Sequence, residues 1–339
     1  MADIIFTEGS GLNDSIFGKS QAPIRMFLEK KAESFESMSL LPELFNVSDS
    51  KNWGEKMTAM TAMNGFEPVG ENGKHPVSGM QEGFSKFLEH ETWKNSFAIS
   101  REIIDDGKLM NLKGRPQAFI TAYYRTKEMF AAALYAAAIN GKKVFSFGGK
   151  TFDATGADGL ELFHKAHPSV VEGVTLKQSN LFKEEFSVDA LGAMESKMQD
   201  FRGDKEEVLA VAPNTILIPN DYKLKKDVFA AIGADKDPET ANNGFNYQFG
   251  RWTVIIWQYL NQFIAPNVKP WVLLDSHYNK ENDGAVWLDR VKLEVNSDID
   301  KDTDANVWRG YARFTAGFND WRAFAIGGIS SGSSLGLGF

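Results

Sequence analysis

The feature that most limits how this chain can fold is a long apolar stretch that follows Pro116. In PQAFITAYYRTKEMFAAALYAAAIN the apolar residues recur at steps of three and four, which is the spacing of one helix face. That face carries Phe119, Tyr123, Thr126, Phe130, Ala133 and Ala137. Pro116 suits the first helical turn, and Asn140-Gly141 suits the C-terminal cap. A helix over residues 116–140 would be about 35 Å long, which predicts a spine against which other layers pack.

Residues 51–98 form a glycine-rich stretch that has no obvious layer to cover it. Its glycines and the turn-forming sequence VGENGKHP predict two strands joined by a turn. An isolated two-stranded ribbon is marginally stable in water. Apolar residues nevertheless recur along it: Met57, Met60, Met63, Phe66, Val69, Val77, Met80 and Phe84. The stretch therefore predicts an extended ribbon that must lie on another surface.

The rest of the chain mixes helices and strands, and its class is α+β. Residues 188–201 predict a helix, and APNTILIPNDYKLKKDVF predicts a strand and then a helix capped by Asn220 or Asp221. GRWTVIIWQYL and PWVLLD predict buried strands, and AVWLDRVKLEVNSDID predicts a half-buried one. The first fifty residues show no sustained period, which predicts an arm with short helices.

Residues 304–328, DANVWRGYARFTAGFNDWRAFAIGG, interleave arginines with aromatic residues. Alternation places Arg309, Tyr311, Arg313 and Thr315 on one face of a strand, and a tight turn at residues 318–321 leads into a second strand. Arginines among aromatic residues also occur on surfaces that bind nucleic acid. A net charge of −8, with lysines and acids mixed along the chain, argues against nucleic acid as a tight partner.

Composition and the N-terminal sequence exclude several other classes of protein. The chain has no cysteine, so a disulfide framework, a cysteine-ligated metal site and a thiol nucleophile are all impossible. The N-terminal residues have neither a basic segment nor a continuous apolar run, so they are no signal peptide. The longest apolar run, MFAAALYAAAI from Met129, is too short to span a bilayer. We expect a soluble protein made in a cytoplasm.

Two short motifs resemble catalytic or phosphate-binding sequences but fail on inspection. FGGKTF lacks the earlier glycine of a phosphate-binding loop, because that position is Val144, and a simple Gly-Gly turn is favoured. GISSG and GSSLG match the spacing of a nucleophile elbow, but no histidine follows them. The sequence therefore predicts neither a nucleotide site nor a serine hydrolase.

Two further patterns resemble metal sites. Asp298, Asp300, Asp302 and Asp304 alternate as in calcium loops, but the sixth and twelfth positions are Thr303 and Arg309 where glycine and glutamate are needed. An acidic, solvated turn between two strands is the interpretation that we favour. His164 and His167 lack the pattern of zinc hydrolases, and a structural pair is favoured. No cofactor and no metal site is predicted.

Taken in order, these elements resemble the major capsid proteins of tailed bacteriophages, which have the Hong Kong 97 type fold. DGLELFHKAHPSV resembles the D-G-x-x-L-F-x-x-x-H-P segment of the Mu-like major head subunits, the group to which the resemblance is nearest. APNTILIPNDYKLKKDVF is similar to the strand and helix of the axial domain in that fold. Residues 287–328 look like the closing strands of its peripheral domain. The resemblance covers nearly the whole chain.

The resemblance implies a division of the chain into named domains. It implies an N-terminal arm over residues 1–50, an extended β-ribbon loop over 51–98, a peripheral domain over 99–186 and 285–339, and an axial domain over 187–284. The ribbon would lie on a neighbouring subunit. The stretch around Arg309 and Arg313 would be a hairpin packed on the spine helix, and both arginines would pair with acids of the same or a neighbouring subunit.

The resemblance also implies a function. The chain would be a major capsid protein that forms hexamers and pentamers, closes into an icosahedral head shell and encloses double-stranded DNA without reading its sequence. Portal, scaffolding and cement proteins would be further partners, and the shell would assemble in the cytoplasm of a bacterial host and become part of the virion. No enzyme activity and no membrane partner is expected.

Particular residues are candidates for contacts between subunits. They are the apolar residues Met60, Met63, Phe66, Val69, Val77, Met80 and Phe84 of the ribbon, the four aspartates Asp298, Asp300, Asp302 and Asp304, and Lys74, Asn306, Arg309 and Arg313. Some relatives join a lysine of the extended loop to an asparagine of the peripheral domain, for which Lys74 and Asn306 are the candidates. The four aspartates would meet their own copies at three-fold positions. Two alternatives stay open: an encapsulin, which is a cellular compartment of the same fold, and a soluble enzyme of unrecognised type.

Overall fold

The computed structural model describes residues 4–7, 18–63, 65–105, 109–233, 246–266 and 268–329. The chain forms two compact units, and each is assembled from three separate segments. Unit 1 comprises Met1–Glu55, Leu88–Ala131 and Trp287–Ala316, and unit 2 comprises Lys56–Phe87, Ala132–Val286 and Gly317–Phe339. Both contain helices and sheets, so the α+β class is confirmed.

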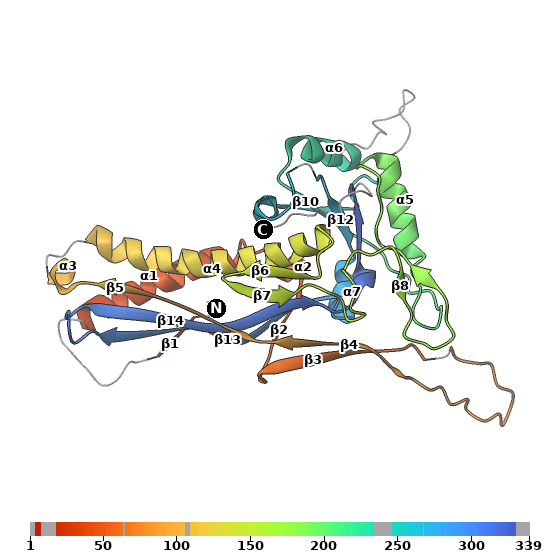
Figure 1. Ribbon diagram of the computed structural model, residues 1–339, viewed down its shortest axis with the longest axis horizontal. Coiled ribbons are helices and arrows are strands. Elements are labelled where there is room, and N and C mark those ends of the chain that lie inside the picture. The colour runs from red at the N-terminus through yellow and green to blue at the C-terminus, as the bar shows by residue number, and fades with distance from the viewer. Residues whose placement is uncertain are drawn as a thin grey trace. The chain divides into compact units, whose positions relative to one another are not determined.

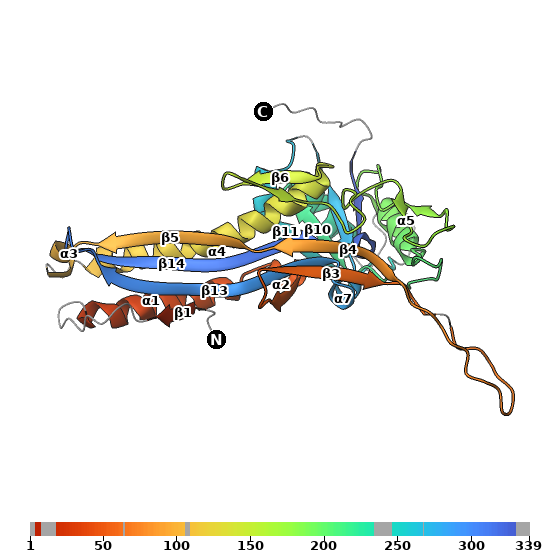
Figure 2. The same ribbon diagram turned by 60° about the horizontal axis from the view of Figure 1, so that its bottom comes forward.

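Unit 1 is built on a five-stranded sheet. Its strands follow the order β1 (Ile4–Thr7), β13 (Ala285–Ile299), β14 (Asn306–Phe318) and β5 (Glu91–Ile99), and β2 (Asn46–Asp49) also pairs with β13. β1 lies parallel to β13, whereas β5 lies antiparallel to β14. Figure 2 shows β5, β14 and β13 side by side along most of their length.

The spine helix α4 (Leu109–Ile139) runs along this sheet (Figure 1), and its residues up to Ala131 belong to unit 1. The prediction that Pro116 marks its first turn is wrong, because Pro116 lies inside the helix. A proline there removes one backbone hydrogen bond, but Phe119 and Ile120 just beyond it are fully buried. Their burial holds this part of the chain in helical conformation despite the lost bond.

The predicted end of α4 is confirmed. Gly141 adopts a left-handed φ of 62°, and the N–H of Lys142 donates to the carbonyl of Ala137 over 2.9 Å. This is the backbone pattern of a glycine cap after the last helical turn. Asn140, just before that glycine, also donates through its side-chain amide to the carbonyl of Phe263 within unit 2.

The core of unit 1 consists of aromatic rings that pack against one another between α4 and the sheet. The Phe314 ring stacks on Trp93 at 4.8 Å and on Trp287 at 5.0 Å, and Phe130 of α4 meets it edge-on at 6.1 Å. Gly310 lies so close to Phe119 that a side chain at this position would overlap the ring. The expectation that the apolar face of β14 packs on the spine helix is therefore confirmed.

The N-terminal segment differs from the predicted arm of short helices. α1 spans Gly18–Glu36, and only α2 (Leu41–Leu44) is short. Among the described side chains of α1, Leu28 and Ala32 are buried one turn apart. The ring of Phe35 stacks on Tyr124 of α4 at 5.4 Å. A further short helix, α3 (Arg101–Asp105), precedes α4.

Unit 2 contains a four-stranded sheet in the order β11 (Thr253–Trp257), β10 (Thr215–Pro219), β12 (Trp271–Leu274) and β15 (Phe324–Gly327). Its helices are α5 (Val188–Gln199), α6 (Tyr222–Gly233) and α7 (Ser276–Glu281), with short 3-10 turns η1 (Gln258–Gln262) and η2 (Trp321–Ala323). The hydroxyl of Ser187 caps α5, and the carboxylate of Asp221 accepts from the N–H of Leu224 at the start of α6. The helices predicted at these two places are confirmed.

The predicted hairpin at residues 318–321 is wrong. β14 belongs to the sheet of unit 1, whereas β15 pairs antiparallel with β12 in unit 2. Between them the η2 turn is fixed by the carboxylate of Asp320, which accepts from the N–H of Arg322. All four residues of β15 are buried, and they pair with the equally buried β12.

Smaller sheets complete unit 2. β6 (Val144–Phe147) and β7 (Lys150–Asp153) form a hairpin whose turn is Gly148-Gly149, both with positive φ, so the simple Gly-Gly turn is confirmed. His167, in the short strand β8 (His167–Pro168) that pairs with β9 (Lys177–Gln178), is buried. It is hydrogen-bonded to Asp158 at 2.6 Å and stacked on Trp321 at 4.2 Å. The structural interpretation of the His164 and His167 pair is confirmed, although no helix carries it.

No helix among the described residues is both long enough and apolar enough to cross a membrane. GSSLG and the last three residues of GISSG lie outside the described residues.

Candidate assembly surfaces

The ribbon is a loop held at its base by two paired strands. β3 (Gly54–Met60) pairs with β4 (Glu82–Glu89), and the N–H of Thr61 donates to the carbonyl of Gln81 over 3.0 Å. Beyond this bond no described residue up to Met80 belongs to a strand. At the tip the N–H of Gly73 donates to the carbonyl of Gly70, and Asn72 adopts a φ of 64°. In Figure 2 the loop runs on past the ends of β3 and β4, and near its base the Lys205 ammonium donates to the carbonyl of Gly79 over 2.9 Å.

The ribbon exposes large apolar side chains. Phe66 is 108% exposed and Val77 is 97% exposed, which means that neither touches other parts of the subunit appreciably. The other exposed apolar residues of the loop are Met60, Met63, Val69 and Met80. Met57 and Phe84, nearer the base, are half-buried, and Lys74 at the tip is exposed. A run of exposed apolar side chains of this kind marks an interaction surface.

A buried lysine, which the sequence analysis missed, anchors the base of the ribbon. Lys86 of β4 is 6% exposed and is paired with the carboxylate of Asp153, and its ammonium also donates to the carbonyl and hydroxyl of Thr155. Burial by itself raises the pKa of Asp153, but the hydrogen bonds and charge of Lys86 bring it below its usual value. The partners lie far apart in the sequence, so no local pattern could have revealed the pair.

The acidic turn between β13 and β14 is solvated, as predicted. The carboxylate of Asp300 accepts from the N–H of Asp302 and the hydroxyl of Thr303, and the hydrogen bond from Thr303 lowers the pKa of Asp300. Asp298 pairs with Arg309 at 3.3 Å, and Asp304 pairs with Arg101 at 3.5 Å. Among the described residues no group of three or more metal-ligating side chains is arranged to hold an ion.

The remaining predicted contact residues lie in unit 1 with different degrees of burial. Arg309 is exposed and pairs with an acid of its own subunit, as expected. Arg313 is half-buried and donates to the carbonyl of His90 at 3.5 Å. Asn306 is 1% exposed, and its amide nitrogen has no partner within the described chain. Its covalent linkage to Lys74 stays a prediction.

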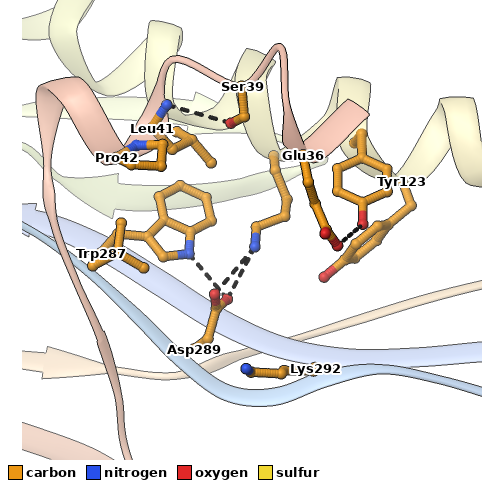
Figure 3. A pocket seen from close by; sticks show the side chains of 11 residues that line it. Glu36, Ser39, Leu41, Pro42, Tyr123, Trp287, Asp289 and Lys292 are labelled. Carbon is orange, nitrogen blue, oxygen red and sulfur yellow. Dashed lines mark hydrogen bonds and ion pairs between the residues drawn. The ribbon is translucent and has the colours of Figure 1, made fainter. Parts of the chain in front are cut away.

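A cavity of about 280 Å³ in unit 1 lies where the α1–α2 connection meets α4 and β13 (Figure 3). Its polar groups bind one another: Asp289 accepts from the Lys127 ammonium at 3.2 Å and from the Trp287 indole at 3.0 Å. The hydroxyl of Tyr124 donates to Glu36 at the end of α1 over 2.8 Å. The bond between Tyr124 and Glu36 attaches α1 to α4, and the pair of Lys127 and Asp289 attaches α4 to β13.

Comparison with known proteins shows to which family the chain belongs. Residues 85–327, which are more than two thirds of the chain, match the family of phage capsid proteins. The chain belongs to this family. No curated protein matches the sequence.

Several solved structures are similar to the chain at low sequence identity. One is from Mycobacterium phage Patience, with 12% identity over 96% of this chain and 92% of that one and a TM-score of 0.47. Another is the mature capsid of bacteriophage PhiM1, with 8% identity over 84% and 86% and a TM-score of 0.48. A third is the holo-SrpI encapsulin complex from Synechococcus elongatus, with 10% identity over 86% and 88% and a TM-score of 0.49.

Membership of the family confirms the main predictions from the sequence. The chain is a phage capsid protein, it is structural rather than enzymatic, and it builds the oligomeric shell of the virion. The Mu-like subgroup stays a prediction, as do the four domain boundaries that the resemblance implied.

Proposed function

We propose that this capsid subunit assembles with copies of itself as hexamers and pentamers into an icosahedral head, and that its ribbon is the main contact between copies. The observation that carries the proposal is the exposed apolar surface of residues 60–80. Burial of apolar area yields about 25 cal/mol per Å², so a few hundred Å² at each contact favours association by several kcal/mol before entropy costs. Methionine suits such a surface, because its flexible side chain fits neighbours of slightly different geometry.

The ribbon can be removed while the strand pairing and the Lys86 anchor at its base are kept, although the bond from the Lys205 ammonium to the carbonyl of Gly79 is lost. We expect that replacing residues 63–79 with a short Gly-Ser linker leaves a folded subunit, because Thr61, Gln81 and the Lys86 anchor remain. The same change should abolish shells in negative-stain images and in sedimentation. Normal shells from this variant would show that the ribbon is dispensable for assembly, and an unfolded subunit would show that it belongs to the core.

Charged residues would also influence the contacts between subunits. Under the same proposal the aspartates of the β13–β14 turn approach their own copies, and cations or salt reduce the repulsion between them. The shell encloses double-stranded DNA without sequence-specific contacts, which agrees with the net charge of −8. Portal, scaffolding and cement proteins are the further partners, and assembly takes place in the cytoplasm of a bacterial host.

The proposed cross-link between Lys74 of one subunit and Asn306 of another has a direct test. Denaturing gels of mature particles would show ladders if the bond forms, and a single band at the mass of the subunit would rule it out. Asn306 is buried in the subunit, so the bond also requires that a neighbouring lysine reaches an enclosed side chain.

A further inference from the structure

His90, the residue that connects β4 to β5, is a buried histidine of unit 1. It is 4% exposed, and its ring Nε2 lies 2.8 Å from the hydroxyl of Ser50. That hydroxyl in turn donates to the carboxylate of Glu55 over 2.7 Å. The backbone adds a second link, because the N–H of His90 donates to the carbonyl of Trp53 over 3.1 Å. Residues 50–55, which lead from β2 into β3, are thus bound to residue 90 through both side chains and backbone.

The donors and acceptors in this chain of contacts determine which ring nitrogen carries the proton. The hydrogen bond from Ser50 lowers the pKa of Glu55, so its carboxylate is ionised near neutral pH and can only accept. The single hydroxyl proton of Ser50 therefore points to Glu55, and the Ser50 oxygen accepts from His90. It follows that the neutral ring carries its proton on Nε2. Nδ1 is left without a proton, is enclosed in the protein and has no partner among the described residues.

The surroundings of the ring oppose a second proton. Burial has the largest effect and lowers the pKa of His90, and the charges of Arg290 in β13 and Arg313 in β14 lower it further. Arg313 also donates to the carbonyl of His90 over 3.5 Å. Glu55 and Asp289 attract a proton, but Asp289 is already paired with a lysine of α4 at 3.2 Å. The folded subunit therefore favours the neutral ring.

A proton added while these contacts are intact would have to bind Nδ1. There it would form a buried donor without an acceptor, in the field of two guanidinium groups, which costs free energy. Separation of residues 50–55 from the ring removes this cost, because the ring can then take up a proton in water.

We propose that His90 is a pH switch: its neutral ring binds residues 50–55, and protonation in mild acid releases them. β3 begins at Gly54, so the release loosens the first strand at the base of the ribbon. An effect of this loosening on assembly rests on the proposed role of the ribbon, whereas the release itself does not.

The test is hydrogen exchange of the full-length, unassembled subunit, with protection factors corrected for the intrinsic pH dependence of exchange. The amides of Ser50 and His90 report on the switch, because they donate to the carbonyls of Asp289 and Trp53. A released ring titrates with the ordinary pKa of about 6.5, so the attachment is fully present above that pH and weakens as the pH falls towards the lower folded pKa. Both protection factors should fall about tenfold between about pH 7.5 and about pH 5.5.

Two variants separate the switch from general acid effects. His90→Gln places an amide N–H near the position of Nε2 and cannot titrate in this range, so its protection should be the same at both pH values. His75→Gln removes an exposed histidine of the ribbon and should leave the fall of the wild type unchanged. A fall that persists in His90→Gln would overturn the proposal, and so would constant protection in the wild type.

A second measurement does not require the variant to fold. Nitrogen NMR of the wild-type subunit with labelled histidine should show the folded His90 ring as the neutral tautomer with its proton on Nε2. A proton on Nδ1 instead, or titration of the folded ring at the ordinary histidine pKa, would also overturn the proposal. If the release occurs as described and the threshold for shell formation does not change with it, only the link to the ribbon fails.

Discussion

The exposed tip of the ribbon allows the strength of one contact to be calculated. In the double variant Phe66→Ser with Val77→Ser, two side chains that are fully exposed in the subunit lose their apolar surface. Complete burial of one such side chain is worth about 1.5–3 kcal/mol. In the double variant, the contact with a neighbouring subunit that covers both side chains is therefore weakened by about 3–6 kcal/mol. Since each 1.4 kcal/mol is tenfold, the association constant of that contact should fall by roughly 100- to 10,000-fold.

Light scattering across a series of subunit concentrations measures this effect as a rise in the threshold for shell formation. The unassembled variant should unfold at the same temperature as the wild type, because substitutions at exposed positions usually change stability by less than about 0.5 kcal/mol. Sedimentation velocity then distinguishes a folded, non-assembling subunit from an aggregate.

A matched control lies in the same loop. Glu67 and Glu71 are exposed, and Glu67→Gln with Glu71→Gln alters the ribbon without removing apolar area, so the threshold should stay near that of the wild type. The reasoning is refuted if the Phe66 and Val77 variant assembles at the wild-type threshold. It is also refuted if the glutamine variant raises the threshold equally, because apolar contact would then not be the cause.

Three further outcomes are expected. Lys127→Met should lower the free energy of unfolding by about 3 kcal/mol in urea titrations, because Asp289 is 10% exposed and loses its cation; a loss below about 1 kcal/mol would contradict a buried pair. Burial raises the pKa of Asp158, but the hydrogen bond and charge of His167 bring it below its usual value. The stabilisation that ionised Asp158 provides is therefore present above the unfolded pKa of about 3.9 and should be lost as the pH falls through the folded pKa. Urea midpoints measured between about pH 5 and pH 2 should show this loss in the wild type and not in Asp158→Asn. Shells should melt at higher temperature in added salt or magnesium, and Asp300→Asn with Asp302→Asn should abolish that dependence; melting that ignores salt would remove the proposed role of the turn.

The sequence predicted those elements whose signals are local. Asp221 at the start of α6 and Gly141 at the end of α4 each act within a few residues of their own position, so pattern alone located them. The exposed residues of the ribbon were also predictable, because a long hairpin in water cannot cover its own apolar side chains.

The failures involve partners that are distant in the sequence. β15 was assigned to a hairpin with β14 because the two are adjacent in the chain, whereas its pairing partner is β12. Pro116 was predicted to start the helix because the hydrogen bond that a proline removes can be recognised from the local sequence. The burial of Ile120, which offsets that loss, depends on the fold and cannot be recognised in this way. The Lys86 anchor combines residues from segments that only the folded chain brings together.

The sheet of unit 1 has a consequence for the order of events during synthesis. Ile4 in β1 pairs with Leu293 in β13, and β5 pairs with β14, so this sheet cannot form until β13 and β14 have been synthesised and have left the ribosome. Contacts of such long sequence separation form slowly. The ribbon with Phe66 and Val77 emerges far earlier, at a time when no copy offers a finished sheet. Newly synthesised chains therefore expose the apolar side chains of the ribbon before the sheet of unit 1 can form. It is in this period that a chaperone would protect them from aggregation.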